Sequence, residues 1–289
     1  MNKKKKSLIH LSKLINLPEI GFKLYKLFFG NNYLRSVNYH CTPSVFTAQF
    51  EQHLKFFYDH YSNVTQQELS NFLGGAKWNK KKPGLIISFD DGLRSNYDYA
   101  APLLEKFGFT GWFVIPPGFI QSEKKHQKAY AVENNIRCRT YYNERIAMSW
   151  QEIRDLTRRG HHISSHTYGH VRLPRSVNPD KIDFEIRQSK KILEQYLDIP
   201  ISSFGWVGGE EENFCTYASD AIRDAGYSFS FNSNAGIILN RTDAFSLGRI
   251  NIESEYSLEA VKFQLSGFMD LFYQLKRARI NKLLSKSND

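Results

Sequence analysis

Two groups of polar residues, each directly after an apolar run, could together bind a metal ion. Asp90 and Asp91 are adjacent carboxylates that follow the apolar residues 84–87, and His166 and His170 stand four residues apart after a second apolar run. Adjacent carboxylates repel one another and aspartate is rarely buried without a partner, so folding alone gives no reason for the pair. Carboxylate and imidazole together are a ligand set suited to zinc or a similar transition metal. The spacing therefore indicates a divalent cation.

The elements that must position these residues alternate between short apolar runs and helical patterns. Two expected helices open with capping boxes, Thr65 with Glu68 and Ser149 with Glu152. The expected strands are residues 34–39, 85–89, 111–115, 162–165, 203–207, 228–231 and 246–250. Strand, helix, strand repetition predicts a parallel sheet covered by helices. We therefore expect one distorted (β/α)7 barrel with parallel strands, and a basic amphipathic helix at each end of the chain.

The polar residues that could carry chemistry all follow expected strands. Besides the four potential ligands, Tyr39 and His40 follow the first strand, residues 208–212 follow the fifth, and Arg249 lies near the seventh. Taken singly, an Asp-Asp pair is more often a turn, and two histidines four apart are more often a helix face or core residues. The carboxyl ends of parallel barrel strands converge on one face, however, so their shared location predicts one site. The long polar segment 116–147 is then a candidate rim or lid.

The positive charge of the chain is concentrated at its two ends. Residues 1–30 hold seven lysines and one glutamate, and residues 276–289 hold five Lys or Arg and one aspartate, so the ends account for the whole net charge of +10. The neutral stretch between them argues against a basic groove for nucleic acid. We expect an N-terminal basic helix at 1–30, a barrel domain at 31–255 and a C-terminal basic helix at 256–289.

Two interpretations of these basic ends are open: helices that pack on the core with solubilising charge outside, or peripheral contact with an anionic membrane surface. No run approaches the roughly 20 apolar residues of a membrane-spanning helix. The lysines at 3–6 precede a segment without the clean apolar core of a signal peptide, so we expect a cytoplasmic location, with the basic ends able to reach the inner face of the membrane. The three cysteines form no Cys-x-x-Cys unit and indicate neither a disulfide framework nor a cysteine zinc site.

Two motifs resemble those of the polysaccharide deacetylases, carbohydrate esterase family four. Residues 88–92, Ser-Phe-Asp-Asp-Gly, are similar to the T-F-D-D-G motif of that family, and residues 165–170, Ser-His-Thr-Tyr-Gly-His, are similar to its two-histidine metal motif. The resemblance covers roughly residues 34–252. The Tyr39-His40 pair is similar to the start of the branch that acts on surface and biofilm polysaccharides.

The resemblance implies a hydrolase that removes the acetyl group from an N-acetylhexosamine in a surface polysaccharide or its precursor. Asp91, His166 and His170 would bind one divalent metal ion, zinc by preference, and Asp90 would act as base toward a water whose pKa the cation lowers. The residues expected to contact the N-acetylated glycan are Tyr39, His40, Trp206, Gly208 through its backbone N–H, and Glu211.

The chain departs from the family pattern in two places. Val207 and Gly208 stand where proline and an aromatic residue are usual, which alters the region of the oxyanion donor. No histidine follows the second histidine ligand, although many relatives carry a general-acid histidine late in the chain. The proton for the leaving amine would then come from Asp90 acting again, from His40, or from one of the glutamates at 210–212.

Arg249 has two interpretations: it orients Asp90 and keeps it ionised, or it forms an ordinary salt bridge at the barrel rim. The departures also keep other functions open. One is a catalytically weak or inactive barrel that binds glycans or helps to assemble them, and another is an O-acetyl esterase. If the enzyme is cytoplasmic, a lipid-linked or nucleotide-linked precursor fits better than a mature polymer.

Overall fold

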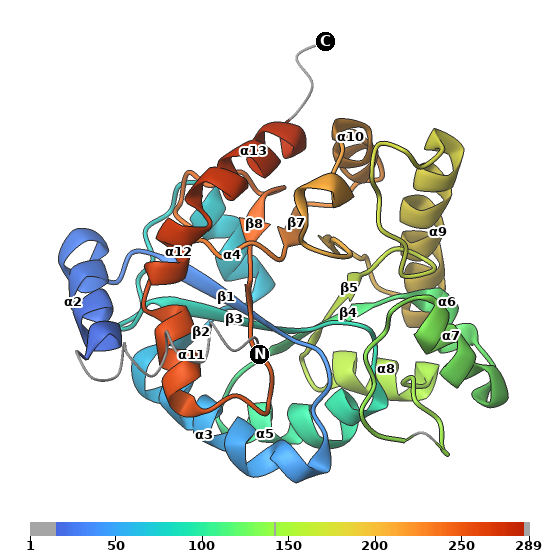
Figure 1. The fold of residues 1–289 in the computed structure, drawn as a ribbon, viewed down its shortest axis with the longest axis horizontal. Helices are drawn as coiled ribbons and strands as arrows, with labels where there is room; N and C mark the ends of the chain where they lie inside the picture. The colour runs from blue at the N-terminus through green and yellow to red at the C-terminus, as the bar shows by residue number, and fades with distance from the viewer. Residues whose placement is uncertain (1–15, 142, 286–289) are drawn as a thin grey trace.

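A ring of parallel strands surrounded by helices forms the centre of the molecule (Figure 1). The structure is a computed structural model that describes residues 16–141 and 143–285. Every pairing between its named strands is parallel. The strands are β1 (Leu34–Tyr39), β2 (Ser62–Asn63), β3 (Gly84–Phe89), β4 (Gly111–Ile115), β5 (His162–Ser165), β6 (Ser203–Gly205), β7 (Phe229–Asn232), β8 (Leu247–Gly248) and β9 (Ile250–Asn251).

The ring returns to its first strand through one short extended segment. The strand order is β8-β7-β6-β5-β4-β3-β1-β9, and β2 pairs with β3 outside this path. Strands β8 and β9 are separated in sequence by Arg249 alone, and β8 pairs with β7 while β9 pairs with β1. The pairing between neighbouring strands is shortest between β5 and β6, where one pair of residues, Ser165 and Phe204, is in register. The expected distorted (β/α)7 barrel is therefore confirmed, with the seventh strand divided at Arg249.

Helices cover the outside of the ring, and local sequence signals explain where several of them begin. Both expected capping boxes are present, at the starts of α4 and α8. Asn178 caps α9 with Pro179 in the first turn. The described helices are α2 (Leu17–Phe29), α3 (Thr47–His60), α4 (Gln66–Leu73), α5 (Ala101–Lys106), α6 (Pro117–Gln121), α7 (Gln127–Glu133), α8 (Trp150–Arg158), α9 (Pro179–Leu197), α10 (Thr216–Asp224), α11 (Leu258–Leu265), α12 (Phe268–Phe272) and α13 (Gln274–Leu284).

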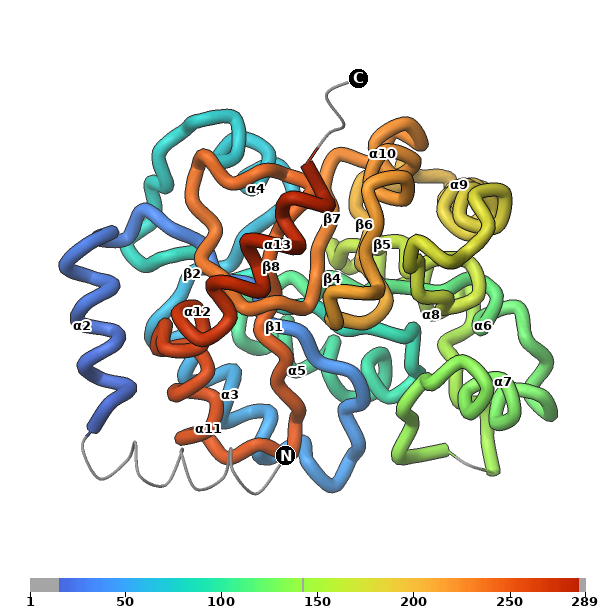
Figure 2. The backbone as a smooth tube through the Cα atoms, turned by 45° about the horizontal axis from the view of Figure 1, so that its top comes forward, coloured from blue at the N-terminus to red at the C-terminus, as the bar shows by residue number. Residues whose placement is uncertain are grey.

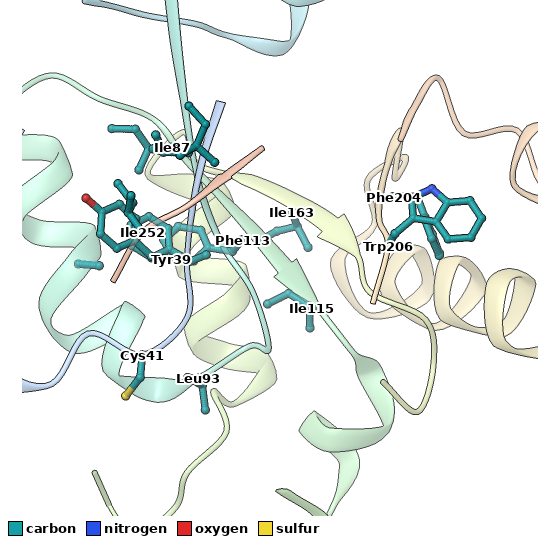
Figure 3. Packing of buried hydrophobic residues seen from close by; sticks show 14 of the residues in the cluster. Tyr39, Cys41, Ile87, Leu93, Phe113, Ile115, Ile163, Phe204, Trp206 and Ile252 are labelled. Atoms are coloured by element: carbon teal, nitrogen blue, oxygen red, sulfur yellow. The ribbon is translucent and has the colours of Figure 1, made fainter. Parts of the chain in front are cut away.

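The main core lies between the outer faces of the strands and the helices (Figure 3). Tyr39, Phe89 and Phe113 from three neighbouring strands stack in this layer, with ring centroids 5.5 and 5.2 Å apart. Because side chains alternate along a strand, the residues between them face the inside of the barrel. The inside is apolar at the amino ends of the strands, where Leu34 and Trp112 are buried, and polar at the carboxyl ends.

Helix α2, near the start of the chain, packs beside α11, near its end, on the outside of the barrel (Figure 2). Helix α2 covers part of the predicted N-terminal helix, and residues 1–15 lie outside the described part. The single helix expected at 256–289 is instead three helices, α11 to α13. The first break falls at Gly267, whose φ of 95° is incompatible with continuing an α-helix. Within the described residues, no helix combines the length and the apolar character needed to cross a bilayer.

Candidate active site

The two adjacent aspartates lie at the carboxyl end of β3, and both side chains are buried. Asp90 continues the pairing of β3 with β1 by donating its backbone N–H to the carbonyl of Tyr39, at 2.9 Å. Asp91 has a φ of 75°, in the left-handed region that a residue other than glycine seldom adopts. This turn stops the strand and lets both carboxylates remain at the mouth of the barrel, because the alternation of a regular strand would send one of them outward.

The two histidines come from the turn that follows β5. His166 extends the strand by donating its N–H to the carbonyl of Ile115, and His170 has a φ of 60° at the far side of the turn. Glu185 on α9 holds the turn in place by accepting the N–H of Gly169 at 2.7 Å. The imidazole rings lie 4.9 Å apart.

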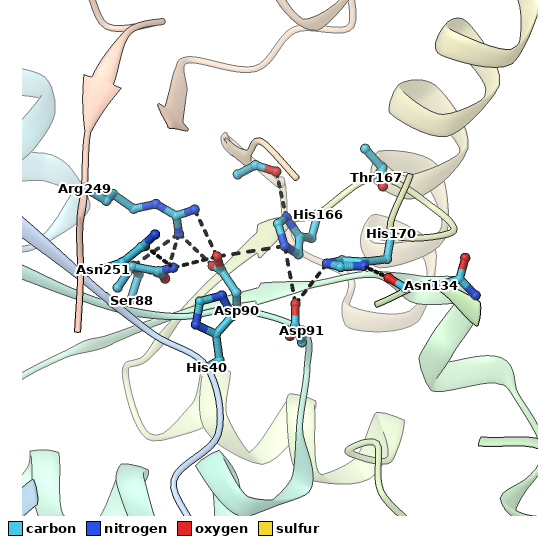
Figure 4. Close-up of polar contacts among 12 residues, drawn as sticks. His40, Ser88, Asp90, Asp91, Asn134, His166, Thr167, His170, Arg249 and Asn251 are labelled. Atoms are coloured by element: carbon cyan, nitrogen blue, oxygen red, sulfur yellow. Dashed lines mark hydrogen bonds and ion pairs between the residues drawn. The ribbon is translucent and has the colours of Figure 1, made fainter. Parts of the chain in front are cut away.

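Each imidazole is oriented by a backbone carbonyl. His166 Nδ1 lies 2.8 Å from the carbonyl oxygen of Gly205, and His170 Nδ1 lies 2.6 Å from that of Asn134. Because a carbonyl oxygen can only accept, both Nδ1 atoms must donate, and both Nε2 atoms are left to face Asp91 (Figure 4). A second-shell acceptor at Nδ1 is the usual arrangement for metal-ligating histidine.

The donor atoms of Asp91, His166 and His170 fit a single metal ion. They all lie within 4.8 Å of one another. Asp91 Oδ1 is 3.0 Å from His170 Nε2 and 3.6 Å from His166 Nε2, yet it is buried without a hydrogen-bond partner. Lone pairs directed at one another in a buried place repel unless a cation or a proton lies between them. One carboxylate and two imidazoles also leave coordination positions free, as in catalytic rather than structural sites.

Asp90 lies beside this cluster and is held by a different set of partners. Arg249 forms two hydrogen bonds with its carboxylate, at 2.6 and 3.0 Å, and Asn38 donates a third at 2.8 Å. Arg249 is fully buried and also donates to Asn38 Oδ1 and Ser88 Oγ. Asp90 Oδ2 is still only 3.9 Å from His166 Nε2. The structure thus separates the roles of the aspartates: Asp91 faces the histidines and Asp90 faces the arginine.

The charges around the two aspartates keep both of them ionised. Burial would raise the pKa of Asp90, but the charges of Arg249 and His166 outweigh it and lower the pKa. Burial likewise opposes ionisation of Asp91, and the histidines hold the pKa of Asp91 well below its ordinary value. Burial would lower the pKa of His170, but its contact with Asp91 raises it.

A cavity of about 720 Å³ opens onto these residues, and His40 lies on its wall. His40 Nδ1 is 3.0 Å from Glu253 Oε1, and Nε2 has no hydrogen-bond partner among the described residues. Burial would lower the pKa of His40, but the Glu253 hydrogen bond and the charge of Asp91 raise it to about 9. Gly208 also lines the cavity. The predicted rim contributes as well, since Asn134 and Arg137 from the segment 116–147 form part of the wall.

Three residues expected to contact substrate lie elsewhere. Tyr39 is fully buried on the outer face of β1, where its hydroxyl is 3.1 Å from His53 Nδ1. Trp206 is buried among aromatic side chains, and its indole N–H donates to Ser230. Both point outward because they alternate with inward-facing residues of their strands. Glu211 pairs with Arg279 on α13 and does not line the cavity, unlike its neighbour Glu210.

Sequence patterns did not identify three further residues of the site. Asn38 is an inward-facing polar residue in an apolar strand, and Glu253 is an acid shortly after the last strand, so both positions carried a weak signal. Asn134 contributes its backbone carbonyl, which any residue could supply. No sequence signal could have identified it.

Comparisons with known proteins agree with this geometry. Residues 77–230, just over half of the chain, match the polysaccharide deacetylase family. A Bacillus subtilis protein, YxkH, named as a candidate polysaccharide deacetylase, is 22% identical over 205 residues, which are 71% of this chain and 64% of that protein. This chain therefore spans less than two thirds of the length of that relative.

Solved structures share the fold. The Streptococcus pyogenes deacetylase PplD, solved in complex with acetate, gives a TM-score of 0.64 at 19% identity over 81% of this chain and 98% of that one. IcaB from Ammonifex degensii gives 0.63 at 19% identity over 83% and 97%. A de-N-acetylase from Aggregatibacter actinomycetemcomitans gives 0.65 at 17% identity over 81% and 100%. With the family match across both motifs of the site, the chain belongs to the polysaccharide deacetylase family.

Proposed function

We propose that this protein is a metal-dependent deacetylase that hydrolyses the N-acetyl group of an N-acetylhexosamine in a surface polysaccharide or its precursor. One observation carries the proposal. The unpartnered oxygen of Asp91 and the Nε2 atoms of both histidines meet at one point, and the carboxylate of Asp90 lies beside it at the floor of an open cavity. A module that only binds glycan has no need of a base next to a metal site.

Asp91, His166 and His170 would hold a divalent cation, which supplies Lewis-acid polarisation and lowers the pKa of a nearby water. Asp90 is the base that accepts the proton of the attacking water. Arg249 is a positioning residue: its two hydrogen bonds fix the carboxylate and keep it ionised, so Asp90 is ready to accept a proton at neutral pH.

The leaving amine needs a proton, and His40 is placed to donate it. His40 lines the same cavity as Asp90, and its Nδ1 is engaged by Glu253 while Nε2 carries the proton that can be transferred. The carboxylate of Glu253 favours the imidazolium, as the raised pKa of His40 reflects. This assignment accounts for the absence of a histidine late in the chain, since a residue after the first strand takes that role. The products are acetate and a free amine on the sugar.

The shape and lining of the cavity suit a sugar attached to a larger molecule. A volume of about 720 Å³ is within the usual range of roughly 300–1,000 Å³ for small-molecule sites, and the opening lets a polymer or a carrier extend outward. Gly208, at the wall, has a φ of 82°, and its backbone N–H is the candidate donor to the oxyanion that forms on the acetyl group.

Acetate release tests this proposal directly. The protein, reconstituted with Zn²⁺, Co²⁺ or Ni²⁺, is incubated with defined N-acetylated oligosaccharides, with O-acetylated analogues, and with lipid-linked or nucleotide-linked N-acetylhexosamine. We expect release from the N-acetylated substrates that chelator abolishes and that Asp90→Asn reduces by about 10²- to 10⁴-fold without loss of the metal. Release from O-acetylated substrates alone would make the protein an esterase. No release from any of them would leave a glycan-binding barrel.

A further inference from the structure

The outer surface of the two terminal segments exposes an unusual number of large apolar side chains. Seven of the thirteen large hydrophobic residues that are exposed in the described part of the chain lie there, with between 42% and 77% of their surface accessible. We call these seven the terminal patch. They are Ile20, Leu24, Leu27 and Phe28 on α2, Leu271 and Phe272 on α12, and Leu275 at the start of α13.

Helix α2 has a second apolar face that already packs on the protein. Gly21 approaches the turn between α11 and α12 so closely that a Cβ there would lie 2.2 Å from the carbonyl oxygen of Ser266. Phe22 packs against Phe56 on α3, with ring centroids 6.0 Å apart. Residues spaced i, i+4, i+7 and i+8 share one side of a helix, so the α2 members of the terminal patch form a stripe on the opposite side. The contacts of the inner face are therefore sufficient to hold α2 on the protein, and the outer stripe is not needed for this packing.

A buried ion pair fixes the two halves of the terminal patch relative to each other. Arg35 on β1 contacts both carboxylate oxygens of Asp270 on α12, at 2.8 and 2.7 Å. Tyr25 on α2 donates its hydroxyl to the same carboxylate, and the guanidinium lies 4.5 Å from the centre of the Tyr25 ring. Helices α2 and α12 are therefore held on one side of the barrel (Figure 2), and rotation of α2 to hide its outer stripe would break this cluster.

The charges around the terminal patch are almost all positive. Lys23, Lys26, Lys276 and Lys282 form no ion pair among the described residues. Of the acids on α2 and α12, Glu19 stands in the first turn of α2, and Asp270 is neutralised in the buried ion pair. The chain continues from α2 into residues 1–15, which include five more lysines and no acid. Two copies joined through this patch would bring these lysines together. An anionic lipid surface instead matches both the apolar stripe and the charge.

We propose that the terminal patch seats the protein on an anionic lipid bilayer, with the apolar side chains at the level of the acyl boundary and the lysines among the headgroups. Both interpretations of the basic ends then hold for α2: one face packs on the core and the other meets lipid. This inference does not depend on the proposed deacetylase activity.

Vesicle co-sedimentation tests it without any measurement of activity. The 289-residue chain is mixed with vesicles of phosphatidylcholine alone or with phosphatidylglycerol added. We expect binding to the anionic vesicles that weakens at least tenfold when salt rises from about 0.1 M to about 1 M, because the Debye length falls from roughly 10 to 3 Å. The double variant Leu27→Glu/Phe28→Glu should lose at least tenfold in binding.

The matched control is Val45→Glu/Val132→Glu, which adds the same two charges at apolar residues outside the patch that are equally exposed, at 75% and 74%. Its binding should equal that of the unchanged protein, and thermal melting verifies that all variants are folded. The proposal is wrong if the unchanged protein does not bind anionic vesicles, or if the double variant binds as well as the control. In either of these cases, sedimentation velocity tests whether the patch is instead covered in a dimer. The double variant would dissociate such a dimer.

Discussion

Replacing Arg249 with methionine would test whether one buried guanidinium both holds the barrel closed and keeps Asp90 charged. Methionine retains most of the length and apolar bulk of the side chain but removes every donor. Arg249 is fully buried and is the cation that pairs with Asp90. Breaking a buried ion pair leaves an uncompensated charge and costs about 3–5 kcal/mol, a large part of the roughly 5–15 kcal/mol that stabilises a domain. We expect a loss of this size in the free energy of unfolding at pH 7.

The pH dependence of this loss distinguishes charge from packing. The pKa of Asp90 is lowered in the unchanged protein, because Arg249, together with His166 and His40, outweighs burial. Arg249 is the largest of these opposing contributions, so without the guanidinium we expect burial to raise the folded-state pKa above the unfolded value of about 3.9. A group with a raised pKa contributes stability at low pH and loses it as the pH rises through the folded pKa. The deficit of Arg249→Met should therefore be small near pH 4 and grow toward pH 7.

Urea unfolding in the presence of chelator, at several pH values, measures this deficit. Arg249→Lys serves as the matched variant, since it keeps the charge but cannot form both hydrogen bonds, and it should lose about 1.5–3 kcal/mol. The double variant Asp90→Asn/Arg249→Met should recover part of the deficit because no charge is left buried. An Arg249→Met deficit that is the same at pH 4 and pH 7 would refute the electrostatic reasoning, and equal stability at pH 7 would refute the importance of the pair.

Three further predictions follow from the site and the core. His170→Gln should weaken metal binding by more than the roughly 10- to 100-fold that loss of an outer-shell partner costs, measured by competition with a chromogenic chelator. Burial lowers the pKa of His53 to about 4 and that of His162 to about 3. The two neutral histidines therefore contribute to the free energy of unfolding above the unfolded-state pKa of about 6.5, and this contribution is lost as the pH falls toward the folded-state values. Each histidine should remove up to about 1.4 kcal/mol per pH unit, and His53→Leu should flatten this slope in urea unfolding between pH 6.5 and 4. Gly208→Ala should lower the melting temperature more than Gly226→Ala, because both have positive φ but only the first would press a Cβ to 2.6 Å from a side-chain nitrogen. Equal losses would show that φ alone is responsible.

Local sequence patterns were sufficient to predict the barrel and the cluster of Asp91, His166 and His170 that could hold a metal ion. A strand is recognisable from a short apolar run, and the residue that follows it must lie at the carboxyl edge of the sheet. Four expected strands, from β1 to β5 without β2, agree with the structure to within one residue. The different partners of Asp90 and Asp91 cannot be predicted from local patterns in the same way. It depends on Arg249, which approaches from 159 residues away once the last strand closes the ring.

The wrong assignments came from orientation. Tyr39 and His40 are neighbours, yet one points into the outer core and the other into the cavity, because successive side chains leave a strand on opposite sides. The same alternation buries Trp206. Asn38 shows the same parity, since it precedes Tyr39 in β1 and faces the site.

By itself, the sequence determined the fold class, the three candidate metal ligands and the concentration of charge at the two ends, because each depends on residue type and short-range spacing. Only the tertiary structure decided which aspartate meets the arginine, that His40 lines the cavity beside Asp90, and which side of α2 stays exposed. Those outcomes depend on contacts between residues more than a hundred positions apart. Such contacts are fixed by barrel closure and by packing of the terminal helices, which no local pattern encodes.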